Sequence, residues 1–230
     1  MASRIAVIVG HTGGIGSAVA EAITASGTYD TVLGLGRQSD PVLDLLDEET
    51  IKASAKHLKL LEGKVRLVFD ASGALTLDGS RPEKSWREID PHHLARSYAV
   101  NAIGPALLMK HFLPLLPREG RCVFATLSAR VGSIGDNRLG GWYAYRAAKA
   151  GLNQILRTAA VELSRRNPEA IAVALHPGTV RTLLTEKFTK TGLEVQEPDV
   201  AARRLLNVVE GLSPAETGCF FDHLGKPIAW

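Results

Sequence analysis

Short apolar segments rich in β-branched residues alternate along this chain with longer segments of helical periodicity. Most positions in the short segments are apolar, rather than every second one, which predicts strands that are buried on both faces of a sheet. We expect strands at residues 5–9, 31–35, 65–69, 122–127 and 171–175, and helices at residues 16–25, 48–61, 91–116 and 143–166. This alternation, with crossovers of this length, predicts an α/β fold with a doubly wound parallel sheet of the Rossmann type.

The last part of the chain breaks the regular alternation. Residues 182–198 are polar, rich in Lys and Thr and poorly periodic, and they precede a predicted helix at 199–209. We interpret this segment as a lid over a ligand site, with an ordinary surface loop as the alternative. Residues 218–223 resemble a last strand. No internal repeat or low-complexity tract interrupts the pattern, so we expect residues 1–230 to form a single domain.

Composition narrows the classes of function. The chain is 45% apolar and 22% charged, with a formal net charge of +3. Lys and Arg are scattered and few aromatic residues interleave with them, which argues against a nucleic-acid surface. The N-terminal apolar run is too short for a signal sequence or a membrane span, so we expect a cytoplasmic protein that does not bind membranes. The two cysteines and the histidines show no metal-ligand spacing, so we expect no metal.

A glycine-rich turn follows the first predicted strand directly. Residues 10–16 read Gly-His-Thr-Gly-Gly-Ile-Gly and open a helix. Glycine suits this position because a side chain would block the tight turn and keep the backbone away from a pyrophosphate, whose charge the helix N-terminus favours. No Gly-Lys-Ser or Gly-Lys-Thr follows, which excludes a P-loop. The turn therefore predicts a dinucleotide site contacted by Gly10, Thr12, Gly14, Ile15 and Gly16.

The end of the second predicted strand indicates which dinucleotide binds. A carboxylate there would accept hydrogen bonds from the ribose hydroxyls of NAD, whereas a cation would pair with the 2′-phosphate of NADP. This chain has Arg37 at that point, and the nearest acid, Asp40, comes three residues later. Because a guanidinium offers a planar fork of donors to phosphate, we expect NADP, with NAD as the less favoured cofactor. A solvated loop arginine is the alternative interpretation.

Tyr145 and Lys149 lie four residues apart in a predicted helix, so their side chains project from one face. Such a pair can be two surface residues. Alternatively, a nearby ammonium lowers the pKa of the phenol, which can then exchange a proton with a carbonyl or hydroxyl oxygen near neutral pH. With a bound nicotinamide, this pair predicts hydride transfer with Tyr145 as general acid and base.

Taken together, these motifs resemble the short-chain dehydrogenase/reductase family over nearly the whole chain, and most closely its small carbonyl-reductase-like branch. The motifs occur in the family's order: the glycine turn, Asp44-Leu45, Asn101 within Val-Asn-Ala-Ile-Gly, Tyr145-Arg-Ala-Ala-Lys149, and Pro177-Gly-Thr-Val-Arg-Thr182. The resemblance implies that Asp44 and Leu45 flank the adenine and that Asn101 holds a helix carbonyl and a water connected to Lys149. It also implies that Lys149 binds the nicotinamide ribose. The remaining implied cofactor contacts are Ala71, Ser72, Gly73, Pro177, Gly178, Val180 and Thr182.

Two positions depart from the family's pattern. Where the family usually has Asn-Asn-Ala-Gly, this chain has Asp70-Ala-Ser-Gly73, so the usual asparagine side-chain bonds cannot be carried over. The family's substrate-orienting serine commonly stands three residues before a glycine, and that spacing from Gly132 falls on Ala129. At that position a hydroxyl would donate a hydrogen bond to the substrate oxygen as charge develops on it. We expect Ser128 to supply it through a bulge, with Ser133 as the reserve candidate.

Two hypotheses of different classes follow. The first is an NADP-dependent oxidoreductase that interconverts a small-molecule carbonyl and a secondary alcohol, with Asn101, Ser128, Tyr145 and Lys149 as the catalytic residues. The second is an NADP-binding sensor or signalling protein of the same fold without turnover. The helices around residues 98–116 and 143–162 are largely apolar, and in related proteins they pair across a two-fold axis, so we expect a homodimer.

Overall fold

A six-stranded parallel sheet forms the centre of the molecule, in the order β2-β1-β3-β4-β5-β8. The computed structural model describes residues 2–77, 79–182, 185 and 195–230. The strands are β1 (Arg4–Val9), β2 (Thr31–Leu35), β3 (Lys64–Asp70), β4 (Cys122–Leu127), β5 (Ala170–His176) and β8 (Phe220–Asp222). All five pairings are parallel. The predicted doubly wound sheet is confirmed, and each predicted strand lies within two residues of its observed bounds.

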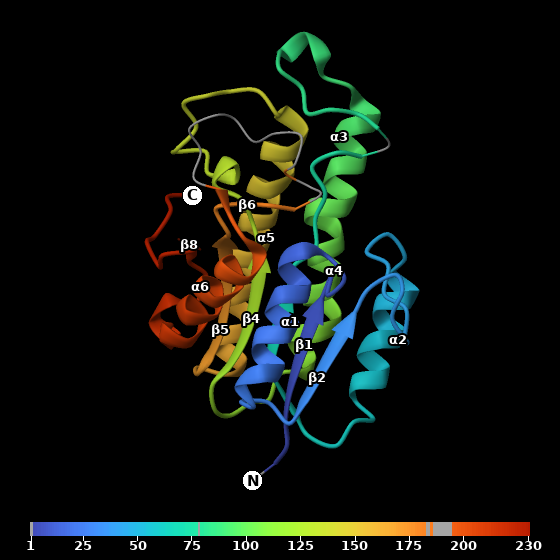
Figure 1. Ribbon diagram of the computed structural model, residues 1–230, viewed down its shortest axis with the longest axis vertical. Helices are drawn as coiled ribbons and strands as arrows, with labels where there is room; N and C mark the ends of the chain where they lie inside the picture. Colours follow the sequence, from blue (N-terminus) through green and yellow to red (C-terminus); the bar gives the residue numbers. More distant parts are fainter. Residues whose placement is uncertain (1, 78, 183–184, 186–194) are drawn as a thin grey trace.

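Helices cover both faces of the sheet, as Figure 1 shows. One face carries α1 (Gly14–Ser26) and α6 (Pro198–Gly211), which pack on the apolar cluster containing Ile8, Phe69 and Val173. The opposite face carries α2 (Glu48–Leu58), α4 (Gly104–Phe112) and α5 (Tyr143–Arg166), with Phe112 and Phe124 in its core. Burial on both faces explains why the strands are almost continuously apolar. Within the described residues, no helix is long and apolar enough to cross a membrane.

The helix predicted at residues 91–116 is interrupted. It consists of α3 (Pro91–Tyr98), a π-helical turn (Ala99–Ile103), α4 and a 3₁₀ turn (Leu113–Leu115). At the interruption the N–H of Gly104 donates to the carbonyl of Ala99, five residues back. Pro105 has no N–H to donate to the carbonyl of Asn101, so a regular helical ladder cannot pass this point. The sequence pattern concealed the interruption because the apolar periodicity continues through it.

The segment after β5 contains two short strands that the pattern did not predict. They are β6 (Thr179–Val180) and β7 (Val195–Gln196), which pair in parallel. The predicted lid at 182–198 falls largely on residues 183–184 and 186–194, which lie outside the described residues. The part that is described, Thr182, Thr185 and β7, lies next to the carboxyl ends of the sheet strands.

Candidate active site

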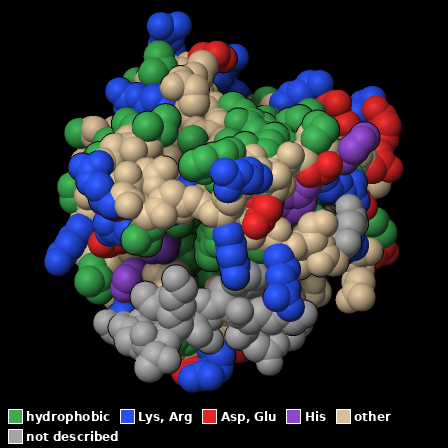
Figure 2. Space-filling view, turned by 90° about the horizontal axis from the view of Figure 1, so that it is seen from above, with side chains coloured by type: hydrophobic (Ala, Val, Ile, Leu, Met, Phe, Trp, Pro, Cys, Tyr) green, Lys and Arg blue, Asp and Glu red, His purple; other side chains and the backbone are tan. Residues whose placement is uncertain are grey.

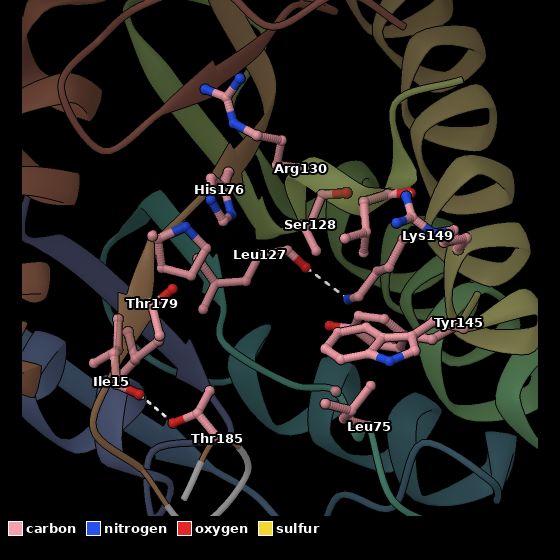
Figure 3. Close-up of a pocket in the computed structure, with 18 of the residues that line it drawn as sticks. Ile15, Leu75, Leu127, Ser128, Arg130, Tyr145, Lys149, His176, Thr179 and Thr185 are labelled. Atoms are coloured by element: carbon pink, nitrogen blue, oxygen red, sulfur yellow. Dashed lines mark hydrogen bonds between the residues drawn. The ribbon is translucent and has the colours of Figure 1, made fainter. Parts of the chain in front are cut away.

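A cavity of about 520 Å³ opens at the carboxyl end of the parallel strands. Ligand sites of open α/β sheets form at this edge, because the loops that follow the strands converge there. Ser128, Lys149 and Tyr145 face the cavity from one side, and Ile15, His176 and Thr179 from the other (Figure 3). Figure 2 looks onto this end of the molecule and shows hydrophobic side chains interspersed with Lys and Arg side chains.

The glycine turn between β1 and α1 leaves no room for side chains. A Cβ on Gly16 would lie 2.1 Å from the carbonyl oxygen of Gly10, and one on Gly14 would lie 2.8 Å from Cγ2 of Thr182. Gly10 itself has a φ of 76°, in the left-handed region that favours glycine. Backbone therefore requires glycine at Gly10 and Gly16, and the Thr182 side chain leaves little space for a larger residue at Gly14, as the sequence predicts.

The N-terminus of α1 lies open beside this turn. No side chain caps the helix, and its first turn contains no acidic residue. The first N–H groups of a helix lack internal partners and carry partial positive charge. Together with the close-packed glycines, they form a cradle that suits an anionic group such as a pyrophosphate. Ile15 from this turn also lines the cavity.

The three residues predicted to meet the adenosine end lie outside the cavity, beyond β2. Arg37 is exposed two residues after the strand, and its guanidinium makes no hydrogen bond or ion pair with the described residues. Asp44 accepts a hydrogen bond from the N–H of Leu46, and Leu45 packs against Gly104 of α4. Because Gly10 donates to the carbonyl of Leu35, the glycine turn and the end of β2 lie next to each other.

Tyr145 and Lys149 share one face of α5, as the four-residue spacing predicts. The Nζ atom of Lys149 lies 5.9 Å from the centroid of the Tyr145 ring and donates to the carbonyl of Leu127 at 2.8 Å. Burial lowers the pKa of Lys149 to about 8, and it raises the pKa of Tyr145. The lowered tyrosine pKa that we expected is therefore not a property of the protein alone. A lowered pKa of Tyr145 would require the Lys149 ammonium to lie closer to the phenol than it does while it donates to the carbonyl of Leu127.

Asn101 lies in the π-helical turn and is fully buried. Its side chain holds residue 74 from both sides: Oδ1 accepts from the N–H of Ala74 at 2.9 Å, and Nδ2 donates to the carbonyl of Ala74 at 2.8 Å. A Cβ on Gly73 would lie 3.2 Å from Oδ1 of Asn101 and 3.4 Å from Nζ of Lys149. Asn101 and Lys149 therefore meet around Gly73, which brings three predicted site residues together.

Both candidate serines make a hydrogen bond to another residue of the protein. Ser128 lines the cavity, but its Oγ donates to Oδ1 of Asn153 at 2.6 Å, and its side chain is 3% exposed. Ser133 is also buried and accepts the N–H of Asp136. Ala129 lines the cavity at the position where the family spacing places the serine. Since a hydroxyl has a single proton to donate, Ser128 as placed cannot donate to a substrate as well.

Trp142 lines the cavity beside the tyrosine, in an unusual backbone conformation. Its φ is 55°, the one positive value among the described residues other than glycine. Its N–H donates to the carbonyl of Glu83 at 2.5 Å, and its ring meets that of Tyr145 edge to face at 6.4 Å. Strained backbone of this kind persists only where the surroundings enforce it. The contact with Tyr145 favours a role for Trp142 in lining the substrate mouth.

His176 is a site residue that sequence reasoning missed. It ends β5, lines the cavity, and has a buried Nδ1 without a hydrogen-bond partner among the described residues. Burial lowers its pKa to about 4, so the ring is neutral at physiological pH. Its place at the carboxyl end of a predicted parallel strand, directly before Pro177, is the signal that could have revealed it. The cavity also receives four of the predicted residues from this segment, namely Pro177, Gly178, Val180 and Thr182.

The parallel sheet, the glycine turn and the Tyr145–Lys149 pair at the cavity define a Rossmann-type oxidoreductase. A family model described as enoyl-(acyl carrier protein) reductase matches residues 9–210. A 1-hydroxy-2-glutathionyl-2-methyl-3-butene dehydrogenase of Rhodococcus sp. (strain AD45) is 32% identical over 193 residues, which are 83% of this chain and 80% of that protein. The protein C-signal of Myxococcus xanthus is 35% identical over 144 residues, 62% of this chain and 82% of that protein.

Solved structures agree with the fold. The NADPH-bound carbonyl reductase from chicken fatty liver has a TM-score of 0.86 at 23% identity, with both chains covered completely. A short-chain dehydrogenase/reductase from Burkholderia multivorans with bound NADP has a TM-score of 0.81 at 25% identity, again over both complete chains. The chain belongs to the short-chain dehydrogenase/reductase family.

Proposed function

We propose that this protein transfers a hydride between NADP(H) and a small carbonyl compound or secondary alcohol, with Tyr145 as general acid and base. The observation that carries the proposal is the pairing of the half-buried Tyr145 with the buried Lys149 in the cavity at the carboxyl end of the sheet. A buried ammonium next to a phenol in a cavity is costly to maintain without a function.

The residues present fit NADP(H). The glycines of residues 10–16 leave space for a pyrophosphate at the open N-terminus of α1, and Arg37 offers after β2 a guanidinium without a partner in the described part of the chain. Two solved relatives of the same fold are described as bound to NADPH or NADP. NADPH would supply the hydride; the protein's own groups would orient the substrate and deliver the proton.

Each site residue then has a role in the proton path. Tyr145 would donate its phenolic proton to the substrate oxygen as the hydride arrives at the carbon. Lys149 would exchange its contact with the carbonyl of Leu127 for the nicotinamide ribose and stabilise the phenolate. Asn101 would fix the turn around Gly73 that packs against Lys149.

The lining of the cavity indicates the kind of substrate. Apolar side chains dominate its walls, and they include Leu75, Leu127, Val131, Leu139 and Trp142. A wall whose surface is mainly apolar favours a carbonyl compound with an apolar body.

Replacing Tyr145 by Phe tests the proposal. The change removes the proton donor and keeps the ring, so carbonyl reduction should fall by about 100-fold or more, with NADPH binding retained. Oxidation of NADPH with a panel of carbonyl compounds is followed by absorbance, and NADPH affinity by fluorescence titration. Tyr143→Phe, two residues earlier on α5 and not among the cavity residues, is the matched control. Parental turnover by Tyr145→Phe would show that the acid is another group.

A second candidate function is NADP-dependent signalling without turnover. It is favoured by the similarity to a protein whose name denotes a signal, and by the Ser128 hydroxyl, which donates to Asn153 and not into the cavity. The carbonyl panel separates the two functions: NADPH oxidation with any compound supports the enzyme, whereas NADPH binding with no oxidation across the panel supports the signalling protein.

We further propose that the protein acts in the cytoplasm as a homodimer. A surface groove between α4 and α5, with Met109, Leu113, Ile155 and Ala159 in its lining, supports pairing through these helices.

A further inference from the structure

A buried carboxylate directly precedes the cavity-lining residues Ala71 and Ser72, at a position where the family usually has an asparagine. Asp70 ends β3, and its side chain is fully buried. Burying a carboxylate costs several kcal/mol unless hydrogen bonds and an opposite charge compensate. An uncharged asparagine would not carry this cost. The carboxylate beside the proposed catalytic residues therefore needs groups that stabilise its charge.

Hydrogen bonds occupy both oxygens of Asp70. Oδ1 accepts from the backbone N–H of Ser72 at 3.0 Å and from Oγ of Ser72 at 2.5 Å. Oδ2 accepts from Oγ1 of Thr126, its neighbour on β4, at 2.7 Å. The backbone N–H can only donate, and three donors together favour the ionised form of the carboxyl group. Burial acts in the opposite direction and raises the pKa of Asp70.

The opposite charge is Lys149, whose side chain extends from α5 toward the turn at residues 70–73. Its side chain is 2% exposed, and its Nζ donates to the carbonyl of Leu127, the residue after the Thr126 that bonds Asp70. A Cβ on Gly73, three residues after Asp70, would lie 3.4 Å from Nζ, so this turn lies next to the ammonium. The ammonium of Lys149 and the carboxylate of Asp70 therefore both contact the short turn at residues 70–73.

The other groups facing Lys149 do not supply negative charge. Tyr145 on α5 is a neutral phenol whose pKa burial raises, and Asn101 from the π-helical turn is an uncharged amide. Among the described residues, Asp70 is the carboxylate that favours the charged form of Lys149, against the burial that disfavours it. Within the described part of the chain, Lys149 is the charged group that acts on Asp70.

We propose that Asp70 is the positioning residue of this site: its carboxylate is the buried counter-charge that keeps the Lys149 ammonium protonated, and its hydrogen bonds fix residues 70–73 against it. The consequence for catalysis rests on the proposed function, whereas the effect on the charge of Lys149 does not. The pair gives this chain a charge arrangement that relatives with asparagine at this position would lack.

Asp70→Asn tests the pairing directly. The amide has nearly the same shape, and it can donate to the hydroxyl oxygen of Thr126 while accepting from Ser72, so the change removes mainly the charge. The pKa of Lys149 should fall by about one unit or more, because an adjacent opposite charge contributes shifts of this size. It is measured by NMR titration of protein carrying ¹³C at the lysine ε-carbons, with the Lys149 signal assigned by its loss in Lys149→Met.

Glu83→Gln is the matched control. It also removes a buried carboxylate near the cavity, but Glu83 bonds the N–H of Ala144 and does not act on Lys149. The pKa of Lys149 should stay at its parental value in this variant. An unchanged pKa in Asp70→Asn, or an equal fall in both variants, would overturn the proposal.

The pH dependence of carbonyl reduction gives a second measurement. Reduction requires the charged lysine and is lost as the pH rises through the pKa of Lys149, so a lower pKa moves this basic limb to lower pH in Asp70→Asn. If neither protein turns over any carbonyl compound but the NMR shift is present, the proposed function fails and the pairing stands.

The double variant covers the case in which Asp70→Asn does not fold. Removing one member of a buried pair leaves an unpaired charge or an unsatisfied group, whereas removing both leaves neither charge. Asp70→Asn/Lys149→Met should therefore fold where Asp70→Asn alone does not and, where both single variants fold, melt at a higher temperature than the additive expectation from them. If the double variant also fails to fold, or if the two effects simply add, the pairing is refuted.

Discussion

The two sides of the cavity are built on different principles. On the cofactor side, the turn at residues 10–16 is fixed by its backbone, because its glycines have little space for a Cβ. On the substrate side, residues 128–142 are fixed largely by side chains, among them Asn153 on Ser128 and Arg146 on the carbonyls of residues 131, 140 and 141. Backbone constraints leave little freedom for variation, whereas side-chain partners can be exchanged. This explains why the glycine turn follows the family's pattern and the serine position is displaced.

Replacing Arg37 by Ser challenges the cofactor side and has the largest expected effect. The change removes the guanidinium fork that we assign to the 2′-phosphate, and charged hydrogen bonds of this kind are each worth roughly 1.5–3 kcal/mol. NADPH should bind about 10–100-fold more weakly, and NADH, which has no 2′-phosphate, should bind as before. Fluorescence titration of both nucleotides measures this. Equal weakening for the two nucleotides would place Arg37 away from the 2′ position.

Much of the fold could be predicted, because its signals are local. Apolar runs that are buried on both faces gave the strands, and helical periodicity gave the helices between them, to within a few residues. The π-helical turn could not be predicted, since it depends on one missing N–H at Pro105 inside an uninterrupted apolar pattern. The pair β6–β7 could not be predicted either, because two residues per strand give no periodicity.

Replacing Trp142 by Ala tests the substrate side at its apolar wall. If the indole stacks against a ring of the substrate, the KM of an aryl ketone should rise by about 2–10-fold, since aromatic pairs contribute roughly 0.5–1.5 kcal/mol. The KM of a small aliphatic ketone should change little, and kcat should be retained for both. Trp142→Phe keeps an aromatic ring in the same strained backbone and should restore most of the difference in steady-state kinetics. The same rise for both ketones would point to a general disturbance of the helix start instead.

The motif residues of the site were predictable, but the partners of their side chains were not. Tyr145, Lys149, Asn101 and the glycines come together as expected, because helical spacing and strand ends determine where they lie. The hydrogen bond from Ser128 to Asn153 joins residues 25 apart, on a strand end and a helix. No local pattern reports such a contact, so the sequence could indicate a missing serine at Ala129 but not the direction of the hydroxyl at Ser128.

Ser128→Ala has the smallest expected effect on catalysis, and it discriminates between two roles of this hydroxyl. A donor to the developing oxyanion would cost about 10²–10³-fold in kcat when removed. A hydroxyl that only pairs with Asn153 would leave kcat within about threefold and instead lower the free energy of unfolding by roughly 1–3 kcal/mol, because the buried amide oxygen loses its partner. From the observed geometry we expect the second result, measured by steady-state kinetics and urea unfolding. Ser133→Ala, made in parallel, tests the reserve candidate: a 100-fold loss there alone would identify Ser133 as the orienting hydroxyl. If both variants turn over normally, Tyr145 is the one hydroxyl of the three that the reaction needs, and the alanine at position 129 is a true departure from the family's active site.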